Sequence, residues 1–189
     1  CMPRMINNIC EHYPRTKMIL NLVDKYYKEG RKILILSDRR EHINIMEKYI
    51  NENIGNNIAG QYVGGMKPDA LRISQEKDII LGTFSMASEG MDIPKLNAII
   101  LASPKSDVEQ SVGRIFREKA CDRTHHPLII DIIDDFSMFK RQSEKRQTMY
   151  RKMNFKLFLN GSNEEFIKVK KSRKKKVKEL YEIDECLLD

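Results

Sequence analysis

The stretch "LNAIILASPKSDVEQSVGRIFRE", residues 96–118, joins an apolar run directly to an amphipathic segment. The run shows no alternation of apolar and polar residues, which is typical of a strand buried on both faces in a parallel sheet. The part that begins at "SDVEQ" has helical spacing, and Ser106 or Asp107 is suited to be its N-cap. A strand that leads through a short polar loop into a helix is the repeating unit of α/β proteins.

The same unit recurs along the chain. Short apolar runs predict four more strands, in "KILIL" (32–36), "IAGQYVGG" (58–65), "DIILGTF" (78–84) and "PLIIDIID" (127–134). Helical spacing predicts helices at 16–30, 40–50 and 67–75, and from Ser137 to about Lys152. The first of these helices is expected to stop at Gly30. The alternation predicts an α/β fold with a parallel sheet flanked by helices.

Length and composition narrow the class of protein. The chain has 189 residues, of which 41% are hydrophobic, so it is long enough for one domain with an extension. No apolar run approaches the roughly 18 residues of a membrane span, and the first residues lack the apolar core of a signal peptide. The 4 cysteines are scattered, which favours reduced thiols over a disulfide framework. We therefore expect an intracellular protein with no membrane partner, in the host cytoplasm or the virion if it is viral.

Charge is divided unevenly along the chain. Residues 1–139 are neutral overall, and residues 140–189 carry the whole formal net charge of +7. Most of this excess lies in the run "KVKKSRKKKVK", residues 168–178. Such a run is expected to be mostly disordered and solvated, and it can still bind the phosphates of nucleic acid or act as a nuclear-import signal. The nucleus is therefore an alternative location.

Polar and glycine-containing segments follow four of the predicted strands. These segments are "SDRR" (37–40), "VGGMKP" (63–68), "TFSMASEGMDIP" (83–94) and "SPKSD" (103–107). In open α/β sheets, ligands bind beyond the carboxyl ends of the strands. The four segments are therefore where the sequence predicts a functional site.

Two arginines stand three residues apart in "EQSVGRIFRE", residues 109–118. On a helix, Gln110, Gly113, Arg114 and Arg117 share one face. The guanidinium group is planar and permanently charged, which suits it to phosphate oxygens. Surface ion pairs with neighbouring glutamates are the commoner reason for an isolated R-x-x-R pair. The pair therefore carries weight only in combination with other motifs.

Read in order, the motifs resemble those of the second RecA-like domain of superfamily 2 helicases, over residues 15–155. "KILILSDRREHI" is similar to motif IV, "LGTFSMASEGMDIP" to motif V, and "QSVGRIFRE" to the Q-x-x-G-R-x-x-R form of motif VI. Two further stretches resemble helicases of phages and large cytoplasmic DNA viruses, including the poxvirus transcript-release helicase group. They are "ASEGMDIPKLNAIILASPKSDVEQSVGRI" and "RQSEKRQTMYRKMNF". The resemblance implies a RecA-like sheet with a helical and basic C-terminal extension.

The resemblance implies an interface with ATP. In this family, two motif VI arginines reach the γ-phosphate of ATP bound on the first RecA-like domain and stabilise the charge that develops during phosphoryl transfer. Arg114 and Arg117 match these arginine fingers, and Gln110 is expected to place the attacking water or the phosphate. The other positions that match nucleotide-binding residues are Gly90, Asp92 and Gly113.

The resemblance also implies a grip on a nucleic-acid backbone that is largely independent of base sequence. Thr83 matches the motif V residue that contacts a phosphate. Backbone amides beside glycines can also approach a phosphate closely. The further candidates after the first and second strands are Ser37, Arg39, Arg40, Gly64 and Gly65. Motif V of the best-known RNA helicases has an arginine where this chain has Glu89, which argues against a simple RNA-helicase assignment and leaves Glu89 without a role.

Two elements of a complete ATPase site do not occur in the sequence, the G-x-x-x-x-G-K-[ST] loop and the D-E-x-[HD] motif. We therefore expect the C-terminal half of an ATP-dependent helicase or translocase, inactive alone. Its partner is an N-terminal RecA-like domain of the same parent chain, which mainly holds the ATP and Mg²⁺. The expected divisions are the end of an interdomain segment (1–14), the RecA-like domain (15–155) and a basic extension (156–189).

Two other functions stay open on the sequence. One is a non-enzymatic nucleic-acid-binding module that has kept the helicase fold. The other is a translocase that moves on a duplex without separating its strands. The motifs do not distinguish DNA from RNA, and they do not give a polarity of movement.

Several other residues that can carry chemistry are expected to be structural. His125 and His126 are predicted to be surface histidines, and we predict no metal site. The aspartates of "DIIDD", residues 131–135, are expected to be solvated and structural. The residues predicted to serve packing are Met138, Phe139 and Met149.

Overall fold

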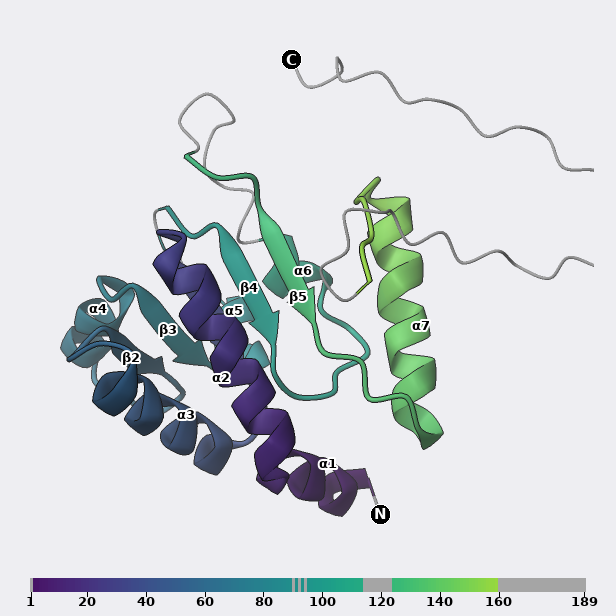
Figure 1. The fold of residues 1–189 in the computed structure, drawn as a ribbon, viewed down its shortest axis with the longest axis horizontal. Coiled ribbons are helices and arrows are strands. Elements are labelled where there is room, and N and C mark those ends of the chain that lie inside the picture. The colour runs from purple at the N-terminus through teal and green to yellow at the C-terminus, as the bar shows by residue number, and fades with distance from the viewer. Residues whose placement is uncertain (1, 90, 92, 94, 114–123, 160–189) are drawn as a thin grey trace, which may run out of the picture.

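The computed structural model describes residues 2–89, 91, 93, 95–113 and 124–159, and these form a five-stranded parallel sheet with helices on both faces (Figure 1). The strand order is β2-β3-β1-β4-β5. In chain order the elements are α1 (Met2–Glu11), α2 (Tyr13–Lys28), β1 (Ile33–Leu36), α3 (Arg40–Asn53), β2 (Ala59–Tyr62), α4 (Pro68–Gln75), β3 (Ile79–Gly82), α5 (Phe84–Glu89), β4 (Ala98–Leu101), α6 (Glu109–Val112), β5 (Leu128–Asp131) and α7 (Ser137–Lys152).

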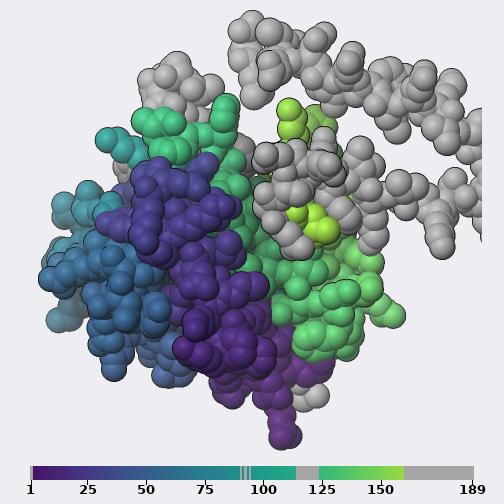
Figure 2. Space-filling model, viewed as in Figure 1, coloured from purple at the N-terminus to yellow at the C-terminus, as the bar shows by residue number. Residues whose placement is uncertain are grey.

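The central strand shows why the apolar runs form a sheet buried on both sides. Ile33 and Ile35 of β1 point into a core with α2 and α3, while Leu34 and Leu36 point into a second core with α5, α6 and α7. Successive side chains of a strand face opposite ways, so an unbroken apolar run serves both cores at once. The space-filling view shows α1 and α2, in purple, covering the middle of one face (Figure 2).

The register brings the carboxyl ends of the strands to one edge. Leu36 at the end of β1 is level with Gly82 of β3 and with Leu101 of β4. All strand pairs are parallel. The loops that follow β1, β3 and β4 therefore start side by side, although they are far apart in the sequence.

All five predicted strands are confirmed, and so is the α/β class. Gly30 ends α2 with a φ of 79°, a backbone conformation that glycine adopts without strain. The predicted N-cap of the motif VI helix is wrong by at least one residue. The cap position is Val108, and Asp107 Oδ1 accepts the Glu109 N–H at 3.4 Å instead.

A helix at the N-terminus, α1, was not predicted from the sequence. Its Ile6, Ile9 and Cys10 pack with Phe139 of α7 in a small separate core. Phe136 meets Phe139 edge to face, with ring centroids 5.3 Å apart. The packing role predicted for Phe139 is therefore confirmed, and α1 and α7 are joined by this cluster.

The other residues expected to be structural are placed as follows. His126 is exposed, and a ring nitrogen of half-exposed His125 lies 2.9 Å from the Glu29 carbonyl oxygen. Within the described residues, no three His, Cys, Asp or Glu side chains gather as a metal site would require. Met138 and Met149 pack against the cores. No helix in the described part of the chain is long and apolar enough to cross a membrane.

Candidate functional site

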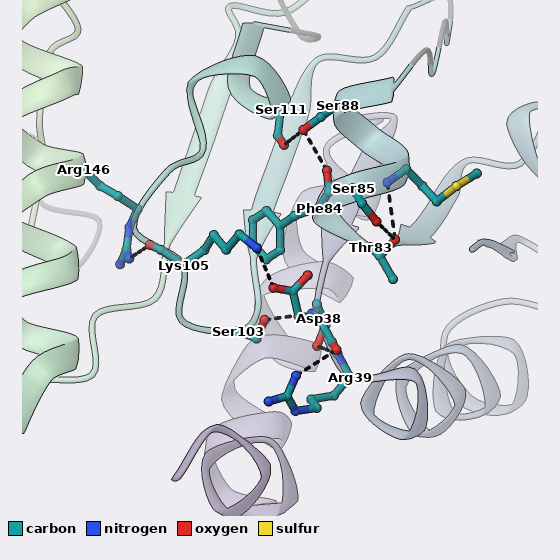
Figure 3. Close-up of polar contacts among 12 residues, drawn as sticks. Asp38, Arg39, Thr83, Phe84, Ser85, Ser88, Ser103, Lys105, Ser111 and Arg146 are labelled. Atoms are coloured by element: carbon teal, nitrogen blue, oxygen red, sulfur yellow. Dashed lines mark hydrogen bonds and ion pairs between the residues drawn. The ribbon is translucent and has the colours of Figure 1, made fainter. Parts of the chain in front are cut away.

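The loops after β1, β3 and β4 meet at the carboxyl edge of the sheet and surround a shallow pocket of about 270 Å³ (Figure 3). The pocket lies where the segments similar to motifs IV, V and VI come together. Its lining is polar on most sides and includes Gln110 of α6, which is exposed. The remaining lining residues are Asp38, Phe84, Ser85, Ser88, Lys105, Asp107, Val108 and Ser111.

An ion pair joins two of these loops. Lys105 Nζ lies 2.9 Å from Asp38 Oδ2, and it sits 5.5 Å from the centroid of the Phe84 ring. The Asp38 N–H donates to Ser103 Oγ at 3.0 Å. Figure 3 shows Lys105 extending past Phe84 towards Asp38. The loops after β1 and β4 are therefore tied to one another at the floor of the site.

Thr83 stands where β3 meets α5. Its Oγ1 lies 3.2 Å from Ser85 Oγ and accepts the Met86 N–H at 3.4 Å. Thr83 is half-buried and Ser85 is exposed. The two hydroxyls consequently present adjacent donors and acceptors at the rim of the pocket.

Arg40 and the two glycines after β2 form a second group beside Thr83. The Arg40 guanidinium donates to the Gly64 carbonyl oxygen through Nη2. Gly65 has a φ of 85°, which a residue with a side chain rarely adopts. Both Arg40 and Gly65 are exposed. The structure therefore brings together three of the residues predicted to grip a backbone, and leaves them open to a ligand.

Arg39 points away from this group, towards the N-terminal helix. Its Nε donates to Asn7 Oδ1, and its Nη2 donates to the Pro3 carbonyl oxygen at 3.3 Å. The Nη1 group donates to the carbonyl oxygen of Asp38 at 3.0 Å. The side chain of Arg39 thus links α1 to the loop after β1.

Ser37 is completely buried and faces inward. Its Oγ lies 3.1 Å from Nδ1 of His42, and Nε2 of His42 lies 3.2 Å from Thr16 Oγ1. Burial, together with the nearby Arg15 guanidinium, lowers the pKa of His42 to about 4. His42 is therefore neutral at physiological pH, and the Ser37 hydroxyl takes part in an internal hydrogen-bond chain.

Two buried arginines brace the carboxyl edge, and the sequence reasoning missed both. Arg15 of α2 makes a two-pronged ion pair with Asp134, at 2.8 and 2.9 Å, and also donates to the Ala102 carbonyl oxygen at 2.6 Å. Arg146 of α7 pairs in the same way with Asp131, at 2.7 and 2.8 Å. It also donates to the carbonyl oxygen of Lys105. Arg15 therefore joins α2 to the segments after β4 and β5, and Arg146 joins α7 to the end of β5 and the loop after β4.

These clamps correct the expectation of solvated aspartates in "DIIDD" for Asp131 and Asp134, while Asp135 is exposed as expected. The side chains of Asp131 and Asp134 are only 12% and 11% exposed. Tyr150 donates to Asp131 Oδ2 at 3.2 Å, and burial together with the Asp131 carboxylate raises the pKa of Tyr150. The carboxylates are structural, and they are buried because arginines satisfy them.

Four of the predicted nucleotide-interface residues lie outside the described residues. They are Gly90, Asp92, Arg114 and Arg117. Gln110 and Gly113 are described, and Gly113 is half-buried at the C-cap of α6. Glu89 is exposed at the end of α5. The segment that leads to the two arginines thus begins at the pocket.

A family model described as the helicase conserved C-terminal domain matches residues 15–119. A protein of Acanthamoeba polyphaga mimivirus, provisionally named as an ATP-dependent RNA helicase, is 39% identical over 156 residues. The match covers 82% of this chain and 30% of that protein, so the chain spans less than a third of this relative.

Two solved structures share the fold. The crystal structure of T4 UvsW has a TM-score of 0.65 at 18% identity, covering 82% of this chain and 36% of that one. The helicase MrfA, solved with DNA and AMPPNP, has a TM-score of 0.57 at 17% identity, covering 72% and 20%. The chain therefore belongs to the helicase C-terminal domain family, with the RecA-like fold of superfamily 2 helicases. The likeness to helicases of phages and large DNA viruses is confirmed.

Proposed function

We propose that this chain is the C-terminal RecA-like half of an ATP-dependent nucleic-acid helicase or translocase. In this proposal Arg114 and Arg117 reach the γ-phosphate of ATP held by an N-terminal RecA-like domain of a longer chain. The arginines stabilise negative charge that develops on the phosphoryl oxygens, and Gln110 orients the water or the phosphate. Gly90, Asp92 and Gly113 complete the contact with the nucleotide.

The observation that carries the proposal is the position of Gln110. It begins the Q-x-x-G-R-x-x-R motif, it is exposed, and it lies at the carboxyl edge beside the segments similar to motifs IV and V. The convergence of three motifs at one edge therefore supports the reading as arginine fingers.

The second part of the proposal is a grip on a nucleic-acid backbone. The open group of Arg40, Gly64, Gly65 and Thr83 offers a guanidinium, a glycine turn and a hydroxyl to successive phosphates. Arg39 and Ser37 support this group indirectly, because their side chains hold the loop after β1 from within. MrfA was solved with DNA, and the mimivirus relative is named for RNA, so we propose the backbone as the ligand without choosing the sugar.

Mg²⁺ belongs to the same proposal. In this proposal the N-terminal domain holds the metal together with the β- and γ-phosphates. The metal there neutralises charge on the transferred phosphoryl group. This chain supplies only positively charged side chains and hydrogen-bond donors to that site. Closure of the two domains on ATP and opening after hydrolysis then shift the backbone contacts of one domain against the other.

The test uses the full-length parent enzyme with Arg114→Ala or Arg117→Ala. Each change should lower kcat for ATP by at least about a hundredfold, because a charge that acts in the transition state is lost. Binding of single-stranded DNA or RNA should change little. Arg72→Ala is the matched control, since Arg72 is an exposed arginine of α4. Strong loss of nucleic-acid binding with turnover intact would contradict the assigned roles.

The same preparations separate the remaining functions. A strand-separation assay distinguishes a helicase from a translocase that moves on duplex without unwinding it. A parent chain that binds nucleic acid and hydrolyses no ATP is the outcome expected of a non-enzymatic module. Retained fold in both variants is checked by thermal unfolding.

A further inference from the structure

The ion pair of Lys105 and Asp38 differs from the two buried arginine clamps at the carboxyl edge. The side chains of Lys105 and Asp38 are 39% and 27% exposed, and they lie beside the pocket. The arginine side chains of the two clamps are 8% and 4% exposed and have further carbonyl partners. A half-exposed pair contributes little to stability and can exchange its partner for another anion.

The backbone under Lys105 is held by a buried side chain, whereas its ammonium group is held by a half-exposed ion pair. Arg146 donates to the carbonyl oxygen of Lys105, and Arg146 is itself buried and paired with Asp131. The centroid of the Phe84 ring lies 5.5 Å from Lys105 Nζ. The ring attracts the ammonium group in every Lys105 rotamer that keeps Nζ over the ring face. To turn its charge from Asp38 into the pocket, the Lys105 side chain has to give up only one half-exposed ion pair.

The pocket beside this ammonium is lined by hydroxyl groups. Ser85, Ser88 and Ser111 line it, together with the amide of Gln110. Asp107 also faces it, and one of its oxygens accepts the Glu109 N–H. The Ser85 hydroxyl and the Lys105 ammonium are donors that suit the oxygens of a phosphate group, while the Ser88 hydroxyl already donates to the Phe84 carbonyl oxygen at 2.8 Å.

The pocket is continuous with the open group proposed to grip a backbone. Ser85 lines the pocket, and its hydroxyl lies 3.2 Å from that of Thr83. A backbone phosphate that contacts Thr83 would therefore lie next to the mouth of the pocket. This favours a nucleic-acid backbone over a free nucleotide as the source of the phosphate.

We propose that Lys105 is a backbone-phosphate contact that Asp38 competes for. Without nucleic acid the ammonium pairs with Asp38, and on binding it moves to a phosphate in the serine-lined pocket. No covalent bond changes in this exchange. The inference rests on the proposed function, because it adds a contact to the proposed grip on nucleic acid.

The test measures binding of a fluorescein-labelled oligothymidine to the full 189-residue chain by fluorescence anisotropy. Lys105→Gln should weaken binding about fivefold and Lys105→Arg should largely preserve it, since one charged contact is removed or kept. Asp38→Asn should tighten binding about threefold, because the competing carboxylate is lost. Asp38→Asn should bring no gain when Lys105→Gln is already present, because Asp38 acts through Lys105.

A second ion pair provides a control with the same charge changes. Asp24 and Lys28 pair at 2.7 Å on α2, near its C-terminal end and away from the carboxyl edge. Asp24→Asn and Lys28→Gln alter net charge identically, so they report the general electrostatic effect. Their effects should be smaller, and Asp24→Asn should act equally with and without Lys28→Gln.

Each outcome has a distinct meaning. If the wild-type chain binds no oligonucleotide, the proposed grip and this inference both fail. If it binds and the Lys105 and Asp38 variants match the Lys28 and Asp24 variants, only this inference fails. Inorganic tripolyphosphate serves as the second probe. A change in its affinity with oligothymidine binding unaltered would overturn the backbone assignment in favour of a nucleotide phosphate.

Discussion

The two halves of the carboxyl edge use arginine in opposite ways. Beside β4 and β5, Arg15 and Arg146 are buried, and each is surrounded by a carboxylate and a backbone carbonyl. Beside β2 and β3, Arg40 is exposed and has one carbonyl partner in a glycine turn. Both halves carry the same kind of charge at the same edge of one sheet.

The two halves differ in the exposure of their arginines and not in residue type. A buried guanidinium that makes three hydrogen bonds inside the protein, as Arg15 and Arg146 do, cannot take a phosphate without breaking a buried ion pair, which is costly. An exposed guanidinium loses only water and one weak contact. The β4–β5 half is therefore expected to set stability, and the β2–β3 half to set affinity.

Arg146→Met tests the braced half and has the largest expected effect. Removal of the guanidinium leaves the Asp131 carboxylate buried without its main partner and frees the carbonyl oxygen of Lys105. The free energy of unfolding should fall by about 3 to 5 kcal/mol, measured by urea denaturation. Arg141→Met, on the exposed side of the same helix, should change it by less than about 0.5 kcal/mol. Equal effects of the two changes would remove the distinction between the halves.

His42, which is buried behind this edge, makes the free energy of unfolding depend on pH. Its pKa is about 4 in the folded chain and 6.5 when unperturbed, so the unfolded state binds its proton more readily. The contribution of neutral His42 to the free energy of unfolding is therefore complete above pH 6.5. It is lost as the pH drops towards 4, by up to about 3 kcal/mol. His42→Gln should flatten this part of the stability profile. The exposed His12→Gln should leave it as steep as in the wild-type chain.

Arg40→Gln tests the open half and has the smallest expected effect on the fold. Stability should stay within about 0.5 kcal/mol of the wild type, because the side chain is exposed. Affinity for a single-stranded oligonucleotide should fall about fivefold, and the slope of log affinity against log salt should flatten by about 0.7. Arg72→Gln on α4 is the control with the same charge change. A loss of stability without loss of affinity would place Arg40 among the bracing residues.

The sheet could be predicted because buried parallel strands have a simple signature. "KILIL" and "AIIL" are apolar without interruption, and each serves two cores. The segments after the strands predicted where the candidate pocket lies, because residues of three of them line it. Helix α1 gave a weaker signal, since its apolar Ile6, Ile9 and Cys10 acquire a core only when Phe139 arrives from the far end of the described chain.

Side-chain direction could not be predicted at the site. "SDRR" places Ser37, Arg39 and Arg40 within four residues, yet the structure turns the first inward, the second towards α1 and the third towards Gly64. Helix α7 carries several basic residues, and only packing against β5 selects Arg146 for burial. Lys105 was within a segment marked as a site, but its pairing with Asp38 depends on the order of the strands.

The hydrogen bonds that run through His42 have only one consistent assignment of donors and acceptors. The Thr16 hydroxyl donates to the Cys10 carbonyl oxygen, so its oxygen accepts a hydrogen bond from the Nε2–H of His42. Nδ1 is then the acceptor of a hydrogen bond from the Ser37 hydroxyl, and the Ser37 oxygen accepts the Arg39 backbone N–H. The fold thereby selects one tautomer of a neutral imidazole. The end of α1 and the loop after β1 are coupled through the orientation of these protons.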